Sequence, residues 1–272
     1  MDSPVNLKLL KPKGHLSHYI QGIWSASVSS DASNIAQRWL HSDAGSGILF
    51  NLSGKIVLGN KTIASGGVLL PVSEQAELIT LSPGSLLVGF RFHPGVGFAV
   101  LGEHYEQPTQ ISQAHNSLYG ISALCDQLQS TQGDYARISV LYRWLSTTIN
   151  FNDVAFPAPL RQAVIAVQDL VAPGMLGETI PLSQRQIERQ FKRWIGMSAK
   201  KYQRILRVKH SLDQLKLSPE TNLAGLALQT GFTDQAHMTR EFKQIAKVTP
   251  GQYIRYISCL EPEAVVLGQG NL

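Results

Sequence analysis

The fold of the C-terminal half of this chain is decided by one stretch, Gly231-Phe232-Thr233-Asp234-Gln235-Ala236-His237-Met238-Thr239-Arg240-Glu241-Phe242-Lys243. An apolar helical pattern over 223–229 precedes it, and Gly231 suits the left-handed position that ends a helix. Asp234 can cap a second helix, whose Met238 and Phe242 fall on one apolar face. The opposite face carries hydrogen-bond donors. This combination predicts a helix, a glycine turn and a second helix of the kind that enters the major groove of DNA.

The same pattern occurs a second time upstream. Arg189-Gln190-Phe191-Lys192 is followed by a turn and Tyr202. In parallel, Arg240-Glu241-Phe242-Lys243 is followed by a turn and Tyr253. An apolar helical pattern over 199–217 separates the two units, and this helix would be about 28 Å long at roughly 1.5 Å per residue. That length would place two recognition helices in successive major grooves, about 34 Å apart on one face of the duplex.

Positive charge gathers in the same region. The chain of 272 residues has a formal net charge of +5, and residues 156–260 carry 15 Lys and Arg against 7 Asp and Glu. The remainder of the chain is slightly acidic. A basic region attached to an acidic one is typical of a protein that binds a polyanion such as DNA. Solvated surface charge is the alternative explanation.

Composition and motifs exclude several other classes of protein. With 43% hydrophobic and 16% charged residues, the chain is globular. We see no secretory signal and no apolar run near the roughly 20 residues that span a bilayer, so we expect a cytoplasmic location and no membrane contact. Cys125 and Cys259 stand alone and are expected to be reduced thiols. No phosphate-binding glycine loop or nucleophile motif is visible, so we expect no enzyme.

The N-terminal part is predicted to be rich in strands, because short β-branched and aromatic segments alternate with Gly, Ser, Asn and Pro. The predicted strands are Tyr19–Val28, Gln37–His41, Gly47–Leu52, Lys55–Leu58, Gly67–Leu70, Ala76–Ile79 and Ser85–Phe92. Ser53-Gly54 is expected to form a hairpin turn between two of them. Apolar stripes then predict helices over 117–129 and 134–150. These stripes suit core packing, or the interface of a homodimer.

The boundary between the two parts is expected near 150–159, because Pro157 and Pro159 cannot lie inside a helix. We therefore predict an N-terminal α+β domain, with a β-rich sheet or barrel followed by two helices. A C-terminal all-α domain follows, with two helix-turn-helix motifs joined by a long helix. The predicted division is 1–155 for the regulatory or dimerisation domain, 156–260 for the DNA-binding domain and 261–272 for a tail.

Basic side chains near the ends of the predicted helices can neutralise phosphates, which gives affinity and register rather than sequence choice. These phosphate-contact candidates are Lys192, Arg193, Lys200, Lys201, Lys243 and Lys247. The arginine of each Arg-x-Phe-Lys unit points away from the buried Phe and could bond in bidentate fashion to guanine or phosphate. Double-stranded DNA is therefore the expected partner.

The C-terminal region resembles the AraC/XylS-type transcriptional regulators. The resemblance lies in Gly231-Phe232-x-Asp234-x-x-x-Met238-x-Arg240-x-Phe242-Lys243, with Thr249-Pro250 and Tyr253 after it, and in Ser183-x-Arg185-Gln186-Ile187-x-Arg189-x-Phe191. It implies two helix-turn-helix motifs. It also implies the residues that face bases or nearby phosphates, namely Arg185, Glu188, Arg189, Gln235, Ala236, His237 and Arg240. Packing or a phosphate contact is the alternative role for Arg189, and capping or packing is the alternative for His237.

The first unit departs from the family pattern. The family has a full positioning helix before the first recognition helix, whereas 172–182 holds two glycines and two prolines, which disfavour a regular helix. We expect a truncated first motif that docks more weakly, or with less sequence choice, than the second. In the N-terminal part, 19–24, 47–52 and 88–95 resemble the β-rich sensor-like domain of a subgroup of these regulators, which implies a regulatory or dimerising role.

Two further features of the N-terminal part concern ligands. The histidines lack the His-x-His spacing of a cupin metal site, so we expect neither a metal nor a cofactor. Aromatic residues on the strands could line an apolar pocket, with core packing as the alternative. The pocket candidates are Trp24, Trp39, Phe50, Arg91 and Phe92. Arg91 could pair with an anionic ligand or with a buried carboxylate.

Together these features predict a sequence-specific DNA-binding transcription regulator, either an activator or a repressor. Its N-terminal domain is expected to receive a small-molecule effector or a regulatory protein, and RNA polymerase is a further partner of an activator. The alternative is a small-molecule-binding or protein-binding sensor whose helical domain is an accessory module for DNA affinity.

Overall fold

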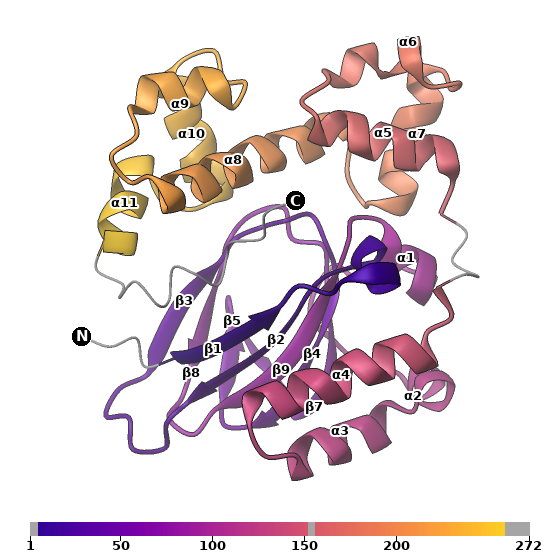
Figure 1. The fold of residues 1–272 in the computed structure, drawn as a ribbon, viewed down its shortest axis with the longest axis vertical. Coiled ribbons are helices and arrows are strands. Elements are labelled where there is room, and N and C mark those ends of the chain that lie inside the picture. The colour runs from indigo at the N-terminus through magenta and orange to yellow at the C-terminus, as the bar shows by residue number, and fades with distance from the viewer. Residues whose placement is uncertain (1–4, 152–155, 259–272) are drawn as a thin grey trace.

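The computed structural model describes residues 5–151 and 156–258 and contains a β-rich part followed by a helical part (Figure 1). The β-rich part has two antiparallel sheets. Helices α3 (Ile121–Ser130) and α4 (Asp134–Thr148) contact strands of the larger sheet. The helical part lies across one end of the sheets, with its longest helix running between two groups of shorter ones (Figure 1). The predicted fold class is thereby confirmed.

The larger sheet has the strand order β1-β2-β9-β4-β7-β10, and the smaller has β3-β8-β5-β6. The strands are β1 (Val5–Leu10), β2 (Ile20–Val28), β3 (Ala36–Leu40), β4 (Gly47–Ser53), β5 (Ile56–Leu58), β6 (Lys61–Ile63), β7 (Gly66–Leu70), β8 (Glu77–Leu81), β9 (Leu86–Phe92) and β10 (Thr109–Gln110). Successive side chains of a strand point to opposite faces. Leu49 and Leu87 therefore pack between the sheets, whereas Phe50 and Val88 pack toward the helices. Both faces of the larger sheet are covered.

The predicted hairpin at Ser53-Gly54 is wrong. The strands on either side of it do not pair, because β4 bonds to β7 and β9 while β5 bonds to β6 and β8. Gly54 has a φ of +80°, and a Cβ on it would lie 2.5 Å from the Cα of Ser85. This glycine turn leads the chain from one sheet to the other. The local hairpin lies one strand later, where Leu58 pairs with Lys61.

The single helix predicted over 117–129 is also wrong. Gly120 has a φ of +61° and ends α2 (Gln113–Tyr119), and α3 begins at the next residue. The interruption leaves Leu118 68% exposed instead of on the buried stripe. Strands β1, β6 and β10 and the short helix α1 (Val96–Leu101) were not predicted from the sequence.

The apolar stripes of α3 and α4 pack against the larger sheet of the same chain. Leu124, Leu128, Leu141 and Leu145 are buried in the core that also contains Phe50 and Phe90 of the larger sheet. A second copy of the chain could therefore meet only the outward faces of these helices. The homodimer stays a prediction. The buried apolar stripes of α3 and α4 cannot form its interface.

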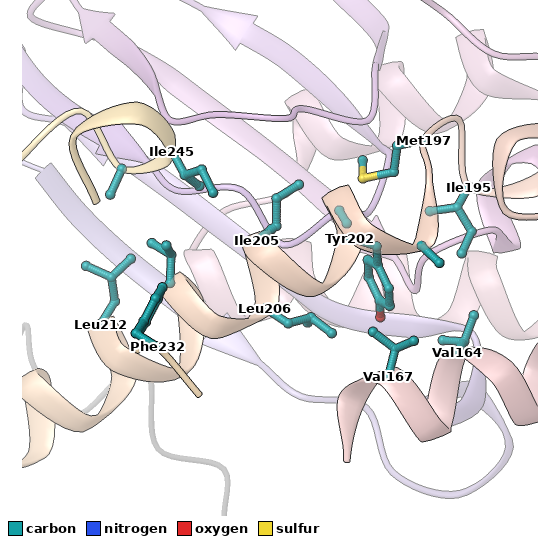
Figure 2. Close-up of a cluster of buried hydrophobic side chains, with 14 of the residues drawn as sticks. Val164, Val167, Ile195, Met197, Tyr202, Ile205, Leu206, Leu212, Phe232 and Ile245 are labelled. Carbon is teal, nitrogen blue, oxygen red and sulfur yellow. The ribbon is translucent and has the colours of Figure 1, made fainter. Parts of the chain in front are cut away.

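Helices form over 199–217 and 223–229 in the helical part, as predicted. Its helices are α5 (Ala158–Gln168), α6 (Leu176–Thr179), α7 (Gln184–Trp194), α8 (Ala199–Leu217), α9 (Leu223–Gln229), α10 (Gln235–Ile245) and α11 (Pro250–Ser258). Helix α8 packs against α5, α7, α10 and α11. Figure 2 shows side chains from both units gathered around α8, with Tyr202 near Val164 and Val167 at one end and Leu212 beside Phe232 toward the other. One continuous core therefore serves both units.

The predicted boundary lies between α4, which ends at Thr148, and α5, which begins at Ala158. Pro159 lies inside a helix, contrary to expectation, but in the first turn of α5, where a missing N–H breaks no helical hydrogen bond. The predicted tail and Cys259 are outside the described residues.

Candidate nucleic-acid interface and adjoining cavity

The second helix-turn-helix unit is α9, the turn at Thr230-Gly231 and α10. Gly231 has a φ of +81°, as the left-handed end of a helix requires. Asp234 caps α10, because its Oδ1 accepts a hydrogen bond of 2.7 Å from the backbone N–H of His237. This bond holds the pKa of the Asp234 carboxyl below its usual value. Both features were predicted from the sequence and are confirmed.

Helix α10 has a buried face and an open face. Met238 and Phe242 are fully buried, while Gln235, Ala236 and Arg240 are exposed. The exposed residues occupy the first half of the helix, the half that reaches base edges in helix-turn-helix proteins. The predicted base-reading residues of this unit, apart from His237, therefore lie together on an accessible surface.

His237 is held by the turn in front of α10. Its Nδ1 lies 3.0 Å from the hydroxyl oxygen of Thr233, and its ring packs edge-on against Phe232 at 5.4 Å between centroids. The side chain is only partly exposed. His237 therefore packs against this turn, and its predicted contact with bases or phosphates stays a prediction.

Glu241, which sequence analysis did not single out, fixes α10 to α8. Arg204 of α8 donates from Nε to Oε2 of Glu241 at 2.7 Å and from Nη2 to Oε1 at 3.0 Å. Arg204 also donates to the side chain of Gln244. Helix α10 is therefore attached to α8 by a partly buried bidentate ion pair as well as by the core beneath it. No local sequence pattern relates these residues, because they lie on different helices.

The first unit presents a similar surface from α7. Ser183 and Gln186 form a reciprocal capping box at its start, with Gln186 Oε1 accepting from the Ser183 N–H at 2.8 Å. Arg185 and Arg189 are exposed, and Glu188 is partly exposed. The two exposed arginines lie one helical turn apart. The predicted residues of this unit are thus brought together as well.

The helix in front of α7 is short, as expected from its prolines and glycines. Over 172–182 the chain forms a 3₁₀ turn, Pro173–Met175, and then the single α-turn of α6. Leu176 of α6 is fully buried in the common core, which anchors the segment. The first unit therefore has a reduced positioning helix but a fully formed recognition helix.

The candidate phosphate contacts are mostly open to solvent. Lys192, Arg193, Lys200, Lys243 and Lys247 are exposed. Lys201 is different, because its ammonium lies 3.0 Å from a carboxylate oxygen of Glu74 in the β-rich part. In this structure Lys201 joins the two parts of the chain, and its predicted phosphate contact would have to share the ammonium with Glu74.

A cavity of about 480 Å³ lies between the two sheets. Trp24, Trp39 and Arg91 line it, as predicted. Phe50 and Phe92 do not, so their prediction as pocket residues is wrong: both are fully buried on the opposite face of the larger sheet. The cause is the alternation of side chains along a strand, which sends their neighbours Leu49 and Arg91 into the cavity instead.

The polar lining of this cavity comes from both parts of the chain. Arg91 pairs with the partly buried carboxylate of Asp43, donating from Nε to Oδ2 at 3.3 Å, and its pairing with an anionic ligand stays a prediction. Lys216 of α8 also lines the cavity, and burial lowers its pKa. Burial lowers the pKa of His41 to about 4, and His41 Nδ1 has no hydrogen-bond partner within 5–151 and 156–258. The cavity thus has mainly apolar walls, with charged side chains from both parts of the chain at their edge.

Within residues 5–151 and 156–258, no three or more His, Cys, Asp or Glu side chains group so that they could hold a metal ion. No helix in the same residues is long and apolar enough to cross a membrane. Burial raises the pKa of the Cys125 thiol to about 11, which makes it a poor nucleophile.

Comparison with known proteins gives one family match and several similar structures. Residues 176–256 match the family described as a helix-turn-helix domain. ToxT from Vibrio cholerae is 13% identical over 93% of this chain and 98% of that chain, with a TM-score of 0.49. A structure of ToxT from the same organism with an unsaturated fatty acid bound is 14% identical over 92% of this chain and 94% of that chain, with a TM-score of 0.42. The AraC-like transcriptional activator CuxR is 9% identical over 93% of this chain and 85% of that chain, with a TM-score of 0.23.

Proposed function

We propose that this chain, whose C-terminal region is an AraC-type helix-turn-helix domain, is a sequence-specific transcription regulator that reads DNA with α7 and α10. The observation that carries the proposal is the open face of α10. There a capped helix with a fully buried apolar side exposes Gln235 and Arg240 on its other side. Glutamine can pair with adenine and arginine with guanine in the major groove.

The two recognition helices are expected to make unequal shares of the base contacts. Helix α10 is preceded by a complete positioning helix and a glycine turn, and Arg204 fixes it to α8. Helix α7 is preceded by the single turn of α6. We therefore assign the main base contacts to α10, with Arg185 and Arg189 of α7 reading a neighbouring segment or its phosphates. The exposed lysines at the helix ends supply affinity that depends on salt.

The cavity between the sheets is the proposed effector site. Its walls include Leu7, Leu49 and Ile79, while Arg38, Arg91 and Lys216 add cationic groups. An apolar molecule with one acidic group fits this lining, because its chain would meet aliphatic walls and its acid a cation. Lys216 belongs to α8, the helix that joins the two units. A ligand bound in the cavity would therefore contact this helix directly. A cytoplasmic location, a homodimer and, for an activator, contact with RNA polymerase complete the proposal.

Selection of random DNA by the purified full-length protein at two salt concentrations tests the DNA-binding function. We expect a defined motif and an affinity that falls steeply with salt. Arg240→Ala should lower affinity for that motif by about 1–3 kcal/mol and relax the choice of one base. The matched control is Arg143→Ala, an exposed arginine on α4 in the β-rich part, which should bind as the wild type does. Weak binding to all sequences, equal in both variants, would refute the proposal.

Thermal unfolding in the presence of medium-chain carboxylic acids and their alcohols tests the effector site. The acid should raise the midpoint more than the alcohol does, because only the acid is charged. Lys216→Met should reduce that difference while roughly keeping the length of the side chain, because Arg38 and Arg91 remain. An equal shift with both ligands would contradict an acidic effector.

A further inference from the structure

Both recognition helices end on the β-rich part of the chain. The carbonyl oxygen of Arg193, in the last turn of α7, accepts a hydrogen bond of 2.8 Å from Nε2 of His104. The carbonyl oxygen of Ile245, at the end of α10, accepts one of 2.6 Å from the backbone N–H of Ala76. A carbonyl can only accept, so His104 carries its proton on Nε2. Each helix thus has a terminal carbonyl satisfied from outside its own domain.

Packing reinforces the contact at α7. The His104 ring stacks on Phe98 at 4.7 Å between centroids, and Phe98 meets Trp194 of α7 edge-on at 5.3 Å. Gly196, with a φ of +85°, lies beneath the histidine, where an added Cβ would stand 3.4 Å from the ring. The end of α7 therefore packs against an aromatic pair, Phe98 and His104, from the β-rich part.

A second set of contacts secures the other unit. Ala76 is only 3% exposed, and two residues earlier Glu74 pairs with Lys201 at the start of α8. Farther along, His41 packs edge-on against Tyr253 of α11 at 5.8 Å. Like the contact at His104, these contacts join the helical part to the β-rich part of the chain. Helix α8 runs across one end of the sheets (Figure 1).

The contacts leave the reading ends of the helices open. Each recognition helix has 11 residues, so its first residue lies about 15 Å along the helix axis from its last. Arg185 and Gln235, near the two starts, are exposed. The β-rich part can therefore hold both helices by their C-terminal ends while their N-terminal ends enter the grooves.

We propose that the β-rich part sets the distance and rotation between the two recognition helices, with His104 and Glu74 as positioning residues. This inference rests on the proposed DNA-binding function. Its physical basis is that one base pair changes the position of a groove by about 3.4 Å and its direction by about 35°. If the two units were joined only by α8 and its flanking turns, they could shift to match a changed spacing of the DNA segments. Contacts of both units with the β-rich part make such a shift harder. The preferred spacing of the two DNA segments is then a property of the whole chain.

The experiment uses the selected operator and versions in which the spacer between its two segments is changed by about one or about two base pairs. Wild type should lose roughly tenfold in affinity at the wrong spacings, about the cost of one lost base contact. The double variant His104→Phe with Glu74→Gln keeps a ring on Phe98 but removes the donor and the charge, and neither position is a DNA-contact candidate. It should bind all spacings within about threefold of one another.

Two controls separate positioning from damage. His104→Gln can still donate from its amide nitrogen, so combined with an intact Glu74 it should restore the wild-type spacing preference. An operator that retains only the segment read by α10 should bind the wild type and the double variant equally. Equal spacing profiles for wild type and double variant, with specific binding intact, would overturn this inference alone. Failure of the wild type to select any motif would instead refute the DNA-binding function on which it rests.

Discussion

The ion pair between Arg204 and Glu241 should be a main attachment of the second recognition helix, and Glu241→Ala is the perturbation that tests it. Arg204 Nε lies 2.7 Å from Oε2, and Nη2 lies 3.0 Å from Oε1. The two side chains are 27% and 12% exposed. The pair is therefore neither a surface contact nor a fully buried one.

The expected magnitude lies between two limits. Exposed ion pairs contribute about 0–1 kcal/mol, whereas removal of one partner of a buried pair costs about 3–5 kcal/mol. After Glu241→Ala, the guanidinium of Arg204 remains partly hydrated and keeps its bond to Gln244. We therefore expect the free energy of unfolding to fall by about 2 kcal/mol, near the value for hydrogen bonds to charged groups.

Urea unfolding of the wild type, Arg204→Ala, Glu241→Ala and the double variant forms the assay, followed by the helical circular dichroism signal. The coupling energy of this cycle should be about 1–2 kcal/mol. Gln244→Ala is the control, since it removes one exposed contact of the same arginine and should cost less than about 1 kcal/mol. A coupling below about 0.5 kcal/mol would refute the reasoning, because the two side chains would then act independently.

Gly231→Ala should destabilise the protein by about 1–2 kcal/mol, because Gly231 has a φ of +81° and its added Cβ would lie 3.2 Å from Arg207. Gly225→Ala is its matched control in α9: its Cβ meets nothing within 4 Å, and thermal unfolding should show a gain of about 0.5–1 kcal/mol. The pKa of His41 is about 4 in the folded chain and near 6.5 in the unfolded chain, so the unfolded chain takes up the proton first as pH drops. The free energy of unfolding should therefore fall between about pH 6.5 and about pH 4. Asp213 partly offsets this effect; His41→Phe should reduce the slope in urea titrations at several pH values, and an unchanged slope would contradict it.

The helical part could be predicted almost completely because its signals are local. The bounds of α8 and α9 match the apolar periodicity, and Ser183 and Asp234 cap the helices that they precede. A cap needs only residues within one turn of it, so one segment of sequence contains all the information. The same reason explains why Gly231 could be placed as the end of α9.

The β-rich part was harder because pairing is not local. Ser53-Gly54 has the composition of a hairpin turn, but whether its flanking strands pair depends on strands far along the chain. The cavity shows the same limit. Alternation indicates that Phe92 and Arg91 face opposite ways, but not which face meets a cavity and which meets α4. The contacts of Arg204 and His104 bring together distant segments and leave no periodic trace in the sequence.

The sharing of α8 by both helix-turn-helix units constrains how this protein can evolve. Each residue inserted into α8 would turn one unit against the other by about 100° and move it by about 1.5 Å. A single insertion would therefore aim one recognition helix away from the groove. An insertion of seven residues would nearly restore the angle, yet it would add about 10 Å, or roughly three base pairs of DNA. Descendants of this chain can thus acquire new base preferences by substitution on α7 and α10, while the number of residues in α8 stays fixed.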